Sequence, residues 1–325
     1  MKIAHLISSQ IFAGIEQHVY ELSSFMSDVS DQVIVCDESI RHHMKGIETK
    51  SLNIGSRYSP YNVYKLIKFL HRNHISILHC HGAKASTIGR GIKIFSSIKV
   101  VATIHGHKKN NHVFTKLDAV IGVNKLLIKN IPRSTYIPNW FNPSHVGTPS
   151  SRTGPIIAIG RLEKVKGFDQ LIKSWVNIKE QLEIIGSGPE EEKLRQLIHE
   201  LRLSDRINLA TNCNYHSIED KYKTAKGLIV SSYREGGPRV VLEAINHEIP
   251  VLGSEVGIIP DLIPQECLSK PGKQESLQIL LEEMVPFLSQ LNMEGVKAAL
   301  IENYSISSAA KKTKEIYEDL LKASS

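Results

Sequence analysis

The sequence predicts an α/β fold with two domains, each built around a mainly parallel sheet. Short apolar runs rich in β-branched residues alternate with amphipathic stretches along the chain, which is typical of parallel α/β units. The 325 residues are enough for two such domains. The segment 142–154 is rich in proline, glycine, serine and threonine, which is the composition of a linker. We therefore expect domains over 1–146 and 147–304 and a closing helix at 305–325.

The first half of the chain predicts alternating strands and helices. Apolar runs predict strands at 2–8, 32–36, 77–82, 100–107, 118–123 and 136–139. Amphipathic spacing predicts helices that begin near residues 12 and 83, and one over 61–72. Gly14 lies at the first strand-to-helix corner. A glycine there commonly only makes the turn, although ligands of such folds collect outside the carboxyl ends of strands.

The second half repeats the alternation. Apolar runs predict strands at 155–160, 182–186, 207–209, 227–230 and 249–254, and helical spacing predicts helices at 194–201, 217–224 and 305–322. Arg161 and Lys166 place two cations after the first of these strands, where basic residues are usually only solvated. Gly186 belongs to a Gly-x-Gly turn, which by itself is weak evidence for a nucleotide site.

The stretch 231–244 combines a strand end, a glycine turn and a helix. Gly236 and Gly237 permit a tight turn with close ligand approach, and Pro238 suits the first helical position. The free backbone N–H groups and the positive end of the helix dipole favour phosphate or sugar oxygens.

Two acids in this stretch need separate explanations. Glu235 lies in the turn, where an acid at a helix N-terminus is stabilised by the dipole in any case. Glu243 lies in an almost wholly apolar part of the helix, so its carboxylate must find hydrogen-bond donors. Arg239 is four residues earlier and could simply pair with it. The residues alone leave the structural and the functional explanation equally open.

Composition is that of an ordinary globular protein, with 41% hydrophobic and 22% charged residues. No apolar run approaches the ~20 residues that a membrane-spanning helix requires. Four widely spaced cysteines without a Cys-x-x-Cys pair indicate reduced thiols and a cytoplasmic protein. His79 with His81, and His105 with His107, lack a partner cluster at metal-ligand spacing, so no metal site is expected.

Charge is distributed unevenly. Residues 1–150 carry 18 Lys and Arg against 8 Asp and Glu, whereas residues 151–325 carry 22 against 25. A basic first half indicates an anionic partner, such as inner-leaflet lipid or a phosphorylated lipid-linked acceptor. Lys108 and Lys109 lie in a polar loop suited to an acceptor or a membrane surface. A solvated basic face is the simpler alternative, and no nucleic-acid-binding pattern is present.

The two acids, separated by seven residues across a strand–turn–helix corner, resemble the Glu-x7-Glu motif of retaining GT-B glycosyltransferases of family 4. Gly-Gly-Pro and Val-Leu-Glu-Ala fall where that family has them. His105 matches its Thr-x-His-Gly position, and Ile137-Pro138-Asn139 its Ile-Pro-Asn segment. Ala13 departs from the family, which has a glycine there. The resemblance covers nearly the whole chain and is strongest across 155–263.

The resemblance implies a role for each candidate residue. Glu235 would contact hydroxyls of the donor sugar, and Glu243 would hold the nucleotide ribose. Arg161 and Lys166 would clamp the pyrophosphate. His105 would reach the transferred sugar, although a histidine that closes an apolar strand is more often incidental. The remaining expected donor-binding positions are Gly14, Gly186, Gly236, Gly237 and Pro238.

The resemblance implies the GT-B fold, in which two Rossmann-like domains face each other across a cleft and the last helix returns to the first domain. The implied activity is retaining transfer of a sugar from a nucleotide diphosphate sugar, such as UDP-hexose or UDP-N-acetylhexosamine. The acceptor would be a hydroxyl of a lipid-linked or saccharide molecule in bacterial envelope polysaccharide or lipopolysaccharide synthesis. The expected location is the cytoplasm, with peripheral attachment to the inner face of the plasma membrane.

No metal or other cofactor is expected, in agreement with the lack of an Asp-x-Asp pair. Three alternatives to this activity stay open. A GT-B sugar-nucleotide epimerase would need no acceptor, and an inverting transferase would need a general base. A catalytically silent nucleotide-sugar-binding scaffold would agree with Ala13.

Overall fold

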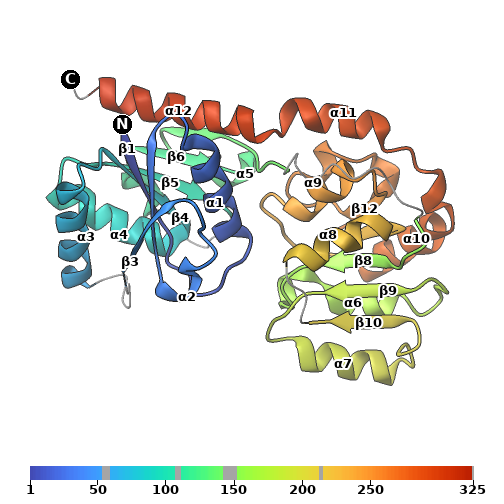
Figure 1. Cartoon of the computed structure of the whole chain (residues 1–325). Coiled ribbons are helices and arrows are strands. Elements are labelled where there is room, and N and C mark those ends of the chain that lie inside the picture. Colours follow the sequence, from blue (N-terminus) through green and yellow to red (C-terminus); the bar gives the residue numbers. More distant parts are fainter. Residues whose placement is uncertain (53–58, 107–110, 142–151, 212–214, 324–325) are drawn as a thin grey trace. The chain divides into compact units, whose positions relative to one another are not determined.

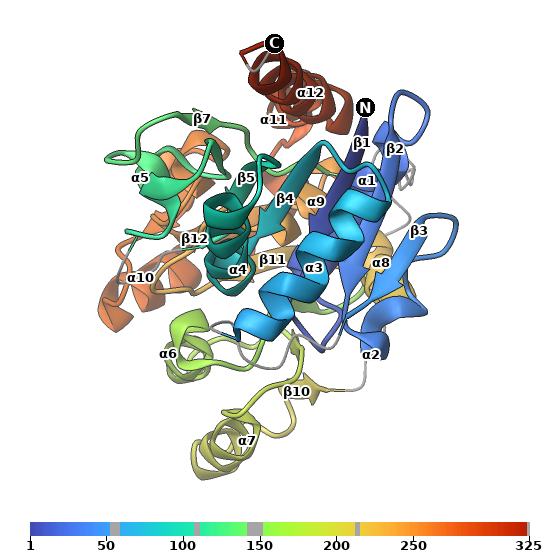
Figure 2. The same ribbon diagram turned by 90° about the vertical axis from the view of Figure 1, so that its left-hand side faces the viewer.

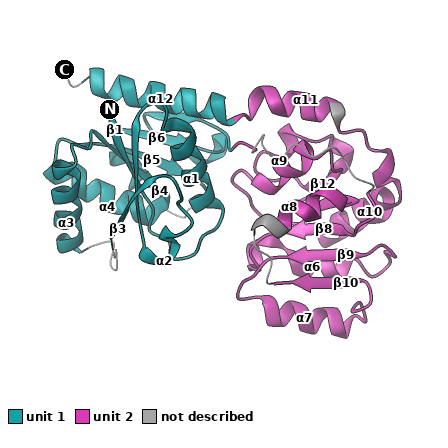
Figure 3. Cartoon of the chain, viewed as in Figure 1, with its two compact units in different colours: residues 1–139, 306–325 teal, residues 140–305 magenta. Residues whose placement is uncertain are grey.

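A computed structural model of the chain describes residues 1–52, 59–106, 111–141, 152–211 and 215–323 (Figure 1). Contacts divide the chain into unit 1, which contains Met1–Asn139 and Ile306–Ser325, and unit 2, which contains Trp140–Ser305 (Figure 3). Each unit has its own sheet and its own hydrophobic core. Two Rossmann-like α/β units, with the C-terminal helix returning to the first, confirm the predicted fold class.

The boundary between the units lies earlier than the sequence predicted. We expected it between residues 146 and 147, but the units divide between Asn139 and Trp140. Phe141 is buried in the unit 2 core, and its backbone N–H donates to the carbonyl of Tyr304 at 3.3 Å. Burial of this apolar side chain joins the chain to unit 2 before the linker-like composition begins. The expected boundary itself falls in 142–151, outside the described residues.

Unit 1 contains a seven-stranded parallel sheet in the order β3-β2-β1-β4-β5-β6-β7. The chain thus winds outward in both directions from β1, as in doubly wound folds. The strands are β1 (Lys2–Leu6), β2 (Asp31–Cys36), β3 (Glu48–Ser51), β4 (Ile77–His81), β5 (Lys99–Ile104), β6 (Ala119–Gly122) and β7 (Ser134–Tyr136).

Helices cover both faces of the unit 1 sheet. Side chains of α3 and α4 pack in one core cluster, α1 packs in another, and α12 contacts α1. The ribbons of α3 and α4 lie in front of the strands of this sheet in Figure 2. Tyr317 of α12 is fully buried, and its hydroxyl lies 2.6 Å from Nδ1 of His79 on β4. The helices are α1 (Gly14–Met26), α2 (Glu38–Arg41), α3 (Pro60–Arg72), α4 (Gly82–Phe95), η1 (Phe114–Lys116), α5 (Lys125–Ile128) and α12 (Ile306–Lys322).

Unit 2 contains a six-stranded parallel sheet in the order β10-β9-β8-β11-β12-β13. It winds outward from β8 as unit 1 does from β1. The strands are β8 (Ile156–Ile159), β9 (Leu182–Ile185), β10 (Ile207–Ala210), β11 (Gly227–Val230), β12 (Val251–Ser254) and β13 (Leu268–Ser269). The α-helices are α6 (Phe168–Ser174), α7 (Glu191–Glu200), α8 (Tyr215–Thr224), α9 (Arg239–Asn246), α10 (Gln274–Met284) and α11 (Glu294–Asn303). The 3₁₀ turns are η3 (Lys164–Lys166), η4 (Ile259–Asp261), η5 (Gln265–Cys267) and η6 (Val285–Gln290).

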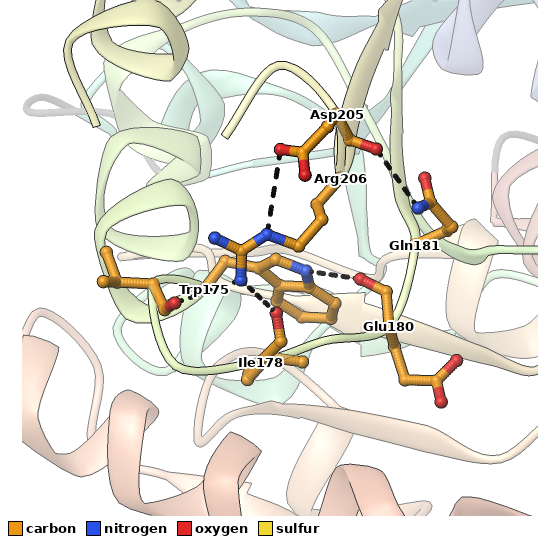
Figure 4. Close-up of polar contacts among 7 residues, drawn as sticks. Trp175, Ile178, Glu180, Gln181, Asp205 and Arg206 are labelled. Atoms are coloured by element: carbon orange, nitrogen blue, oxygen red, sulfur yellow. Dashed lines mark hydrogen bonds and ion pairs between the residues drawn. The ribbon is translucent and has the colours of Figure 1, made fainter. Parts of the chain in front are cut away.

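Polar contacts fasten the connection between α6 and β9 at the amino ends of the strands (Figure 4). The indole N–H of the buried Trp175 donates to the carbonyl of Glu180 at 2.9 Å. Arg206, before β10, donates to the carbonyl of Ile178 at 2.7 Å, and Gln181 donates to that of Asp205 at 3.2 Å. These hydrogen bonds satisfy carbonyl groups of the connecting turns, which take no part in the hydrogen bonding between strands. Hydrogen bonds between neighbouring connections therefore fix this edge of the sheet.

No helix among the residues placed by the structure combines the length and apolar character needed to cross a membrane.

Candidate functional site

Two loops of unit 2 meet because the strands before them are neighbours. β8 and β11 are adjacent and parallel, with Ile157 opposite Leu228. Their carboxyl ends therefore lie at the same edge of the sheet. The segments that follow Ile159 and Val230 converge there, although they are far apart in the sequence.

This convergence brings Lys166 and Glu235 together. The Nζ of Lys166 lies 2.6 Å from Oε1 of Glu235, and the Ser232 hydroxyl donates to the same oxygen at 2.6 Å. The two charged side chains are 23% and 11% exposed. A charge-assisted hydrogen bond of this kind contributes roughly 1.5–3 kcal/mol. The structure thus joins two of the predicted site residues.

Backbone contacts hold the two loops against each other. The backbone N–H of Tyr233 donates to the carbonyl of Val165 at 2.9 Å, and the Ser231 hydroxyl donates to that of Lys166 at 2.9 Å. Gly167 has φ +65°, and a Cβ on it would overlap the carbonyl oxygen of Ser231. Only glycine fits this position at low cost.

Arg161 has a different environment from Lys166. Its guanidinium lies 2.9 Å from Oε1 of Glu163, and its side chain is 61% exposed. The structure therefore places this predicted phosphate ligand in a surface ion pair within its own loop. Such exposed pairs are worth about 0–1 kcal/mol, so Arg161 can turn to another anion at low cost.

Glu243 lies on α9, and its side chain is 17% exposed. Its Oε2 accepts a hydrogen bond from the hydroxyl of Tyr222 at 3.0 Å, and its Oε1 lies 3.9 Å from Arg239. A tyrosine on α8 therefore supplies one of the hydrogen-bond donors that the apolar surroundings of this carboxylate demand. Sequence reasoning missed Tyr222, because a single aromatic residue in an expected helix belongs to no motif.

Gly186 and Gly188 follow β9 and lie against the loop that follows β8. Their φ angles are +152° and +158°. A Cβ on Gly186 would overlap the carbonyl oxygen of Gly160, and one on Gly188 would lie 2.6 Å from that of Leu162. The Gly-x-Gly turn is thus required for close packing of two backbones, beside the loop that carries Lys166.

The start of α9 differs from the prediction in one respect. Pro238 was expected at the first helical position, but the helix begins at Arg239 and Pro238 is its N-cap, with φ −68° and ψ +103°. The carbonyl of Pro238 accepts the first helical hydrogen bond, from Val241 at 3.1 Å. Gly236 and Gly237 lie in the turn before it. A Cβ on Gly257 would lie 2.8 Å from the carbonyl oxygen of Gly236, so this later glycine packs under the turn.

The predicted site residues of unit 1 lie at the carboxyl ends of its strands. Gly14 is the first residue of α1, and a Cβ there would meet no atom within 4 Å. Ala13, the departure from the family, is the N-cap in an extended conformation open to any residue, and its N–H donates to Glu16 at 3.0 Å. Lys108 and Lys109 lie outside the described residues.

His105 belongs to a histidine cluster that the sequence did not predict as a unit. His5 on β1 and His79 on β4 are opposite each other in the sheet, and His81 closes β4. The ring of His18, on α1, lies 4.6 Å from that of His105 between centroids. Every second residue of a strand shares a face. The sequence does not fix the register between β1 and β4. This register places His5 beside His79 and His81.

The amide of Gln32 sets the direction of a hydrogen-bond chain through this cluster. Its Nε2 donates to the Ser30 hydroxyl at 2.7 Å, so its Oε1 faces Nε2 of His5, 2.8 Å away. Burial lowers the pKa of His5 to about 4, which keeps the ring neutral, with Nδ1 as an acceptor. His81 therefore donates from Nε2 to His5 at 3.1 Å and presents Nδ1 to Nε2 of His105 at 3.3 Å. The tautomer assignment follows from these partners.

We expect unit 1 to lose stability as the pH falls from about 6.5 toward 4. His5 titrates with a pKa of 6.5 unfolded and about 4 folded, so the unfolded chain binds more protons within that interval. His5 alone then removes about 2 kcal/mol of unfolding free energy between pH 7.5 and pH 5. Burial also lowers the pKa of His79 and His81, which adds to the loss. Urea unfolding at pH 7.5, 6 and 5 in EDTA measures the change, and constant stability over this range would contradict the neutral buried cluster.

Two family models match the chain. The model for "Glycosyl transferases group 1" matches residues 149–285, and the model for "Glycosyltransferase Family 4" matches residues 12–137. The second match includes the histidine cluster apart from His5, and the first includes Lys166, Glu235 and Glu243.

Known proteins agree with these matches. A phosphatidylinositol N-acetylglucosaminyltransferase subunit from Arabidopsis thaliana is 23% identical over 96% of this chain and 80% of its own length. The sucrose-phosphate synthase of Thermosynechococcus elongatus has a similar structure, with a TM-score of 0.85, 17% identity and coverage of 99% of both chains. Anabaena Alr3699/HepE, solved with UDP and glucose, has a TM-score of 0.83 and 16% identity over 98% of this chain and 100% of its own. The chain is therefore a glycosyltransferase with the GT-B fold.

Proposed function

We propose that the chain transfers a sugar, with retention of configuration, from a nucleotide diphosphate sugar to a hydroxyl of a lipid-linked or saccharide acceptor. The observation that carries this proposal is the pair formed by Lys166 and Glu235 at the carboxyl ends of β8 and β11. A cation and a carboxylate, each partly exposed and fixed by the same two loops, match the two kinds of group in such a donor. The cation suits its phosphates, and the carboxylate accepts hydrogen bonds from its sugar hydroxyls.

The donor proposed is a UDP-hexose or a UDP-N-acetylhexosamine. Anabaena Alr3699/HepE was solved with UDP and glucose, and the Arabidopsis relative is named for transfer of N-acetylglucosamine. Lys166, assisted by Arg161, would bind the diphosphate, and the N–H groups of Gly236 and Gly237 would face it at the start of α9. Glu243, oriented by Tyr222, would accept hydrogen bonds from ribose hydroxyls.

In the proposed reaction the bond between the anomeric carbon and the diphosphate oxygen breaks. A bond from the acceptor hydroxyl oxygen forms on the same face, and the hydroxyl proton passes to a donor phosphate oxygen. Lys166 and Arg161 stabilise the negative charge that develops on the leaving diphosphate, and Glu235 and His105 position the sugar. Catalysis then rests on positioning and preorganised electrostatics, with no protein nucleophile and no metal requirement.

The acceptor proposed is lipid-linked or a saccharide, in synthesis of an envelope polysaccharide or lipopolysaccharide at the inner face of the plasma membrane. The Arabidopsis relative is named as a subunit of a phosphatidylinositol N-acetylglucosaminyltransferase, which supports a lipid acceptor. Residues 1–150 contain 18 basic and 8 acidic residues, so this half of the chain is attracted to an anionic lipid surface. Each cation close to such a surface contributes about 1 kcal/mol to binding.

Replacing Glu243 with alanine is expected to weaken UDP binding about 10- to 100-fold. The ribose loses a charged acceptor worth roughly 1.5–3 kcal/mol. Calorimetric titration of UDP into the full chain measures the effect. Glu248→Gln, which removes a surface partner of Lys297 in the same unit, is the matched control and should bind as the wild type does.

Product analysis completes the test of the proposed function. Incubation with UDP-sugars and acceptor analogues should yield a glycoside with the anomeric configuration of the donor, as read by NMR couplings. An inverted product would contradict retention. An isomerised nucleotide sugar formed without an acceptor would contradict transfer, and unchanged UDP affinity of Glu243→Ala would contradict the placement of the ribose.

A further inference from the structure

We propose that His18, His81 and His105 of unit 1 form a binding site for a divalent transition metal ion such as Zn²⁺. One ring nitrogen of each residue lies within 4.8 Å of the others. The fold explains the convergence. His81 ends β4, His105 follows the neighbouring β5, and His18 is on the helix that follows β1, the other neighbour of β4. From the sequence we expected no metal, because His79 with His81, and His105 with His107, lack a partner cluster at metal-ligand spacing.

The distance between two of the nitrogens suits a tetrahedral ion. Nδ1 of His81 and Nε2 of His105 are 3.3 Å apart, which is long for a hydrogen bond. Two ligands that are each 2.0–2.1 Å from one tetrahedral Zn²⁺ are separated by about 3.4 Å. The ring of His18 stands edge-on to that of His105, with an interplanar angle of 85°, and can supply the third nitrogen.

The outer nitrogens have the partners that metal-binding histidines usually have. A ligating imidazole generally donates its second N–H to an acceptor that fixes its tautomer and orientation. Nε2 of His81 is 3.1 Å from the acceptor Nδ1 of His5, which Gln32 orients in turn. Nδ1 of His18 is 3.2 Å from Oδ1 of Asn139. His81 and His18 thus each have one ring nitrogen in a bond of this kind.

A second group of three histidines, His5, His79 and His81, is also close enough for a metal. There, however, Nδ1 of His79 is bonded to the Tyr317 hydroxyl at 2.6 Å and Nε2 to Thr103 at 2.7 Å. Ligation by His79 would break one of these short buried bonds. In the set with His18 and His105, by contrast, the hydrogen bond between His81 and His105 is long, at 3.3 Å, so this set is favoured.

The chemistry of the three ligands, all imidazole nitrogens and none a carboxylate, determines which metal ions the site would prefer. Such a set favours Zn²⁺, Cu²⁺ and Ni²⁺ over Mg²⁺ and Ca²⁺, which prefer oxygen ligands. His105 is also the residue proposed to reach the transferred sugar. A metal ion bound to Nε2 of His105 would prevent this nitrogen from contacting the sugar, so Zn²⁺ is expected to inhibit sugar transfer. This consequence rests on the proposed function, whereas the binding itself does not.

Calorimetric titration of Zn²⁺ into the full chain, untagged and stripped with EDTA, tests the site. The wild type should bind one equivalent with micromolar or tighter affinity, and His105→Ala and His18→Ala should each weaken binding at least 10-fold. X-ray absorption of the loaded wild type should show nitrogen ligands at 2.0–2.1 Å from zinc and no sulfur. This second measurement needs no variant and so is independent of any folding defect.

The matched control is the double variant His42→Ala/His43→Ala. These two rings lie 4.0 Å apart between centroids, outside the proposed site, and could capture zinc on the surface. The double variant should keep wild-type affinity. Loss of binding in it, unchanged binding in a folded His105→Ala protein, or no binding by the wild type would each overturn the proposal. Zinc binding by a chain that transfers no sugar would overturn only the proposed function.

Discussion

Replacement of Glu235 by glutamine is expected to lower kcat/KM for sugar transfer by about 10²- to 10³-fold, the size of effect seen when a preorganised electrostatic partner is removed. The amide keeps the shape of the side chain, so the Ser232 hydroxyl retains an acceptor. The substitution removes the negative charge of the carboxylate that lies 2.6 Å from Lys166. In the proposed function this carboxylate also accepts hydrogen bonds from the donor sugar. Steady-state kinetics with a saturating acceptor measure the loss.

The chain contains a matched control for this variant. Glu180 pairs with Lys226 at 2.6 Å, the same distance, but both residues lie at the amino ends of the unit 2 strands. Glu180→Gln should therefore change kcat/KM less than threefold. Equal effects of the two variants, or near-normal activity of a folded Glu235→Gln protein, would contradict a catalytic edge at the carboxyl ends of β8 and β11.

Gly186→Ala is expected to destabilise unit 2 by at least about 4 kcal/mol, or to prevent its folding. The φ of +152° is one that side chains rarely adopt, and the new Cβ would overlap the carbonyl oxygen of Gly160. A backbone atom cannot move aside as the tip of a flexible side chain can. Differential scanning calorimetry should show an early transition that corresponds to one unit.

Gly295→Ala tests whether the close approach, rather than the loss of a glycine, causes this effect. Gly295 lies within α11 of the same unit, and a Cβ there meets no atom within 4 Å. Alanine at a helical position stabilises by up to about 1 kcal/mol relative to glycine. A stable Gly186→Ala protein would show that the Gly-x-Gly turn is not required for packing.

The fold was predictable from the sequence because buried parallel strands need continuous apolar runs, and these are visible without structure. β3 escaped prediction because its residues, Glu48–Ser51, are polar and it is the edge strand of its sheet. β13 is only two residues long. The strand expected at 136–139 is instead β7, Ser134–Tyr136, and Pro138 has no N–H to continue a ladder.

The site was predictable in part. The motif positions of Glu235 and Lys166 were visible in the sequence, but their contact depends on β8 and β11 being neighbours, which only the strand order establishes. The ion pair of Arg161 with Glu163 lies on the surface of one loop and was not predictable. Tyr222 was missed because its position opposite Glu243 depends on how α8 and α9 pack.

The histidine cluster shows the same limit. Each histidine alone is an ordinary strand-end or helix residue. Their proximity arises from the register of β1, β4 and β5, and a single sequence of buried apolar strands does not specify that register. A metal-spacing rule applied along the chain therefore overlooks a histidine cluster that is assembled from three strands and a helix.

A crystal structure of the full chain with a non-hydrolysable UDP-sugar would show directly where the donor binds. We expect the diphosphate within hydrogen-bond distance of Lys166 Nζ, sugar hydroxyls at the Glu235 carboxylate and ribose hydroxyls at Glu243. A nucleotide sugar bound elsewhere, with the pair of Lys166 and Glu235 left as it is in the present structure, would contradict this expectation.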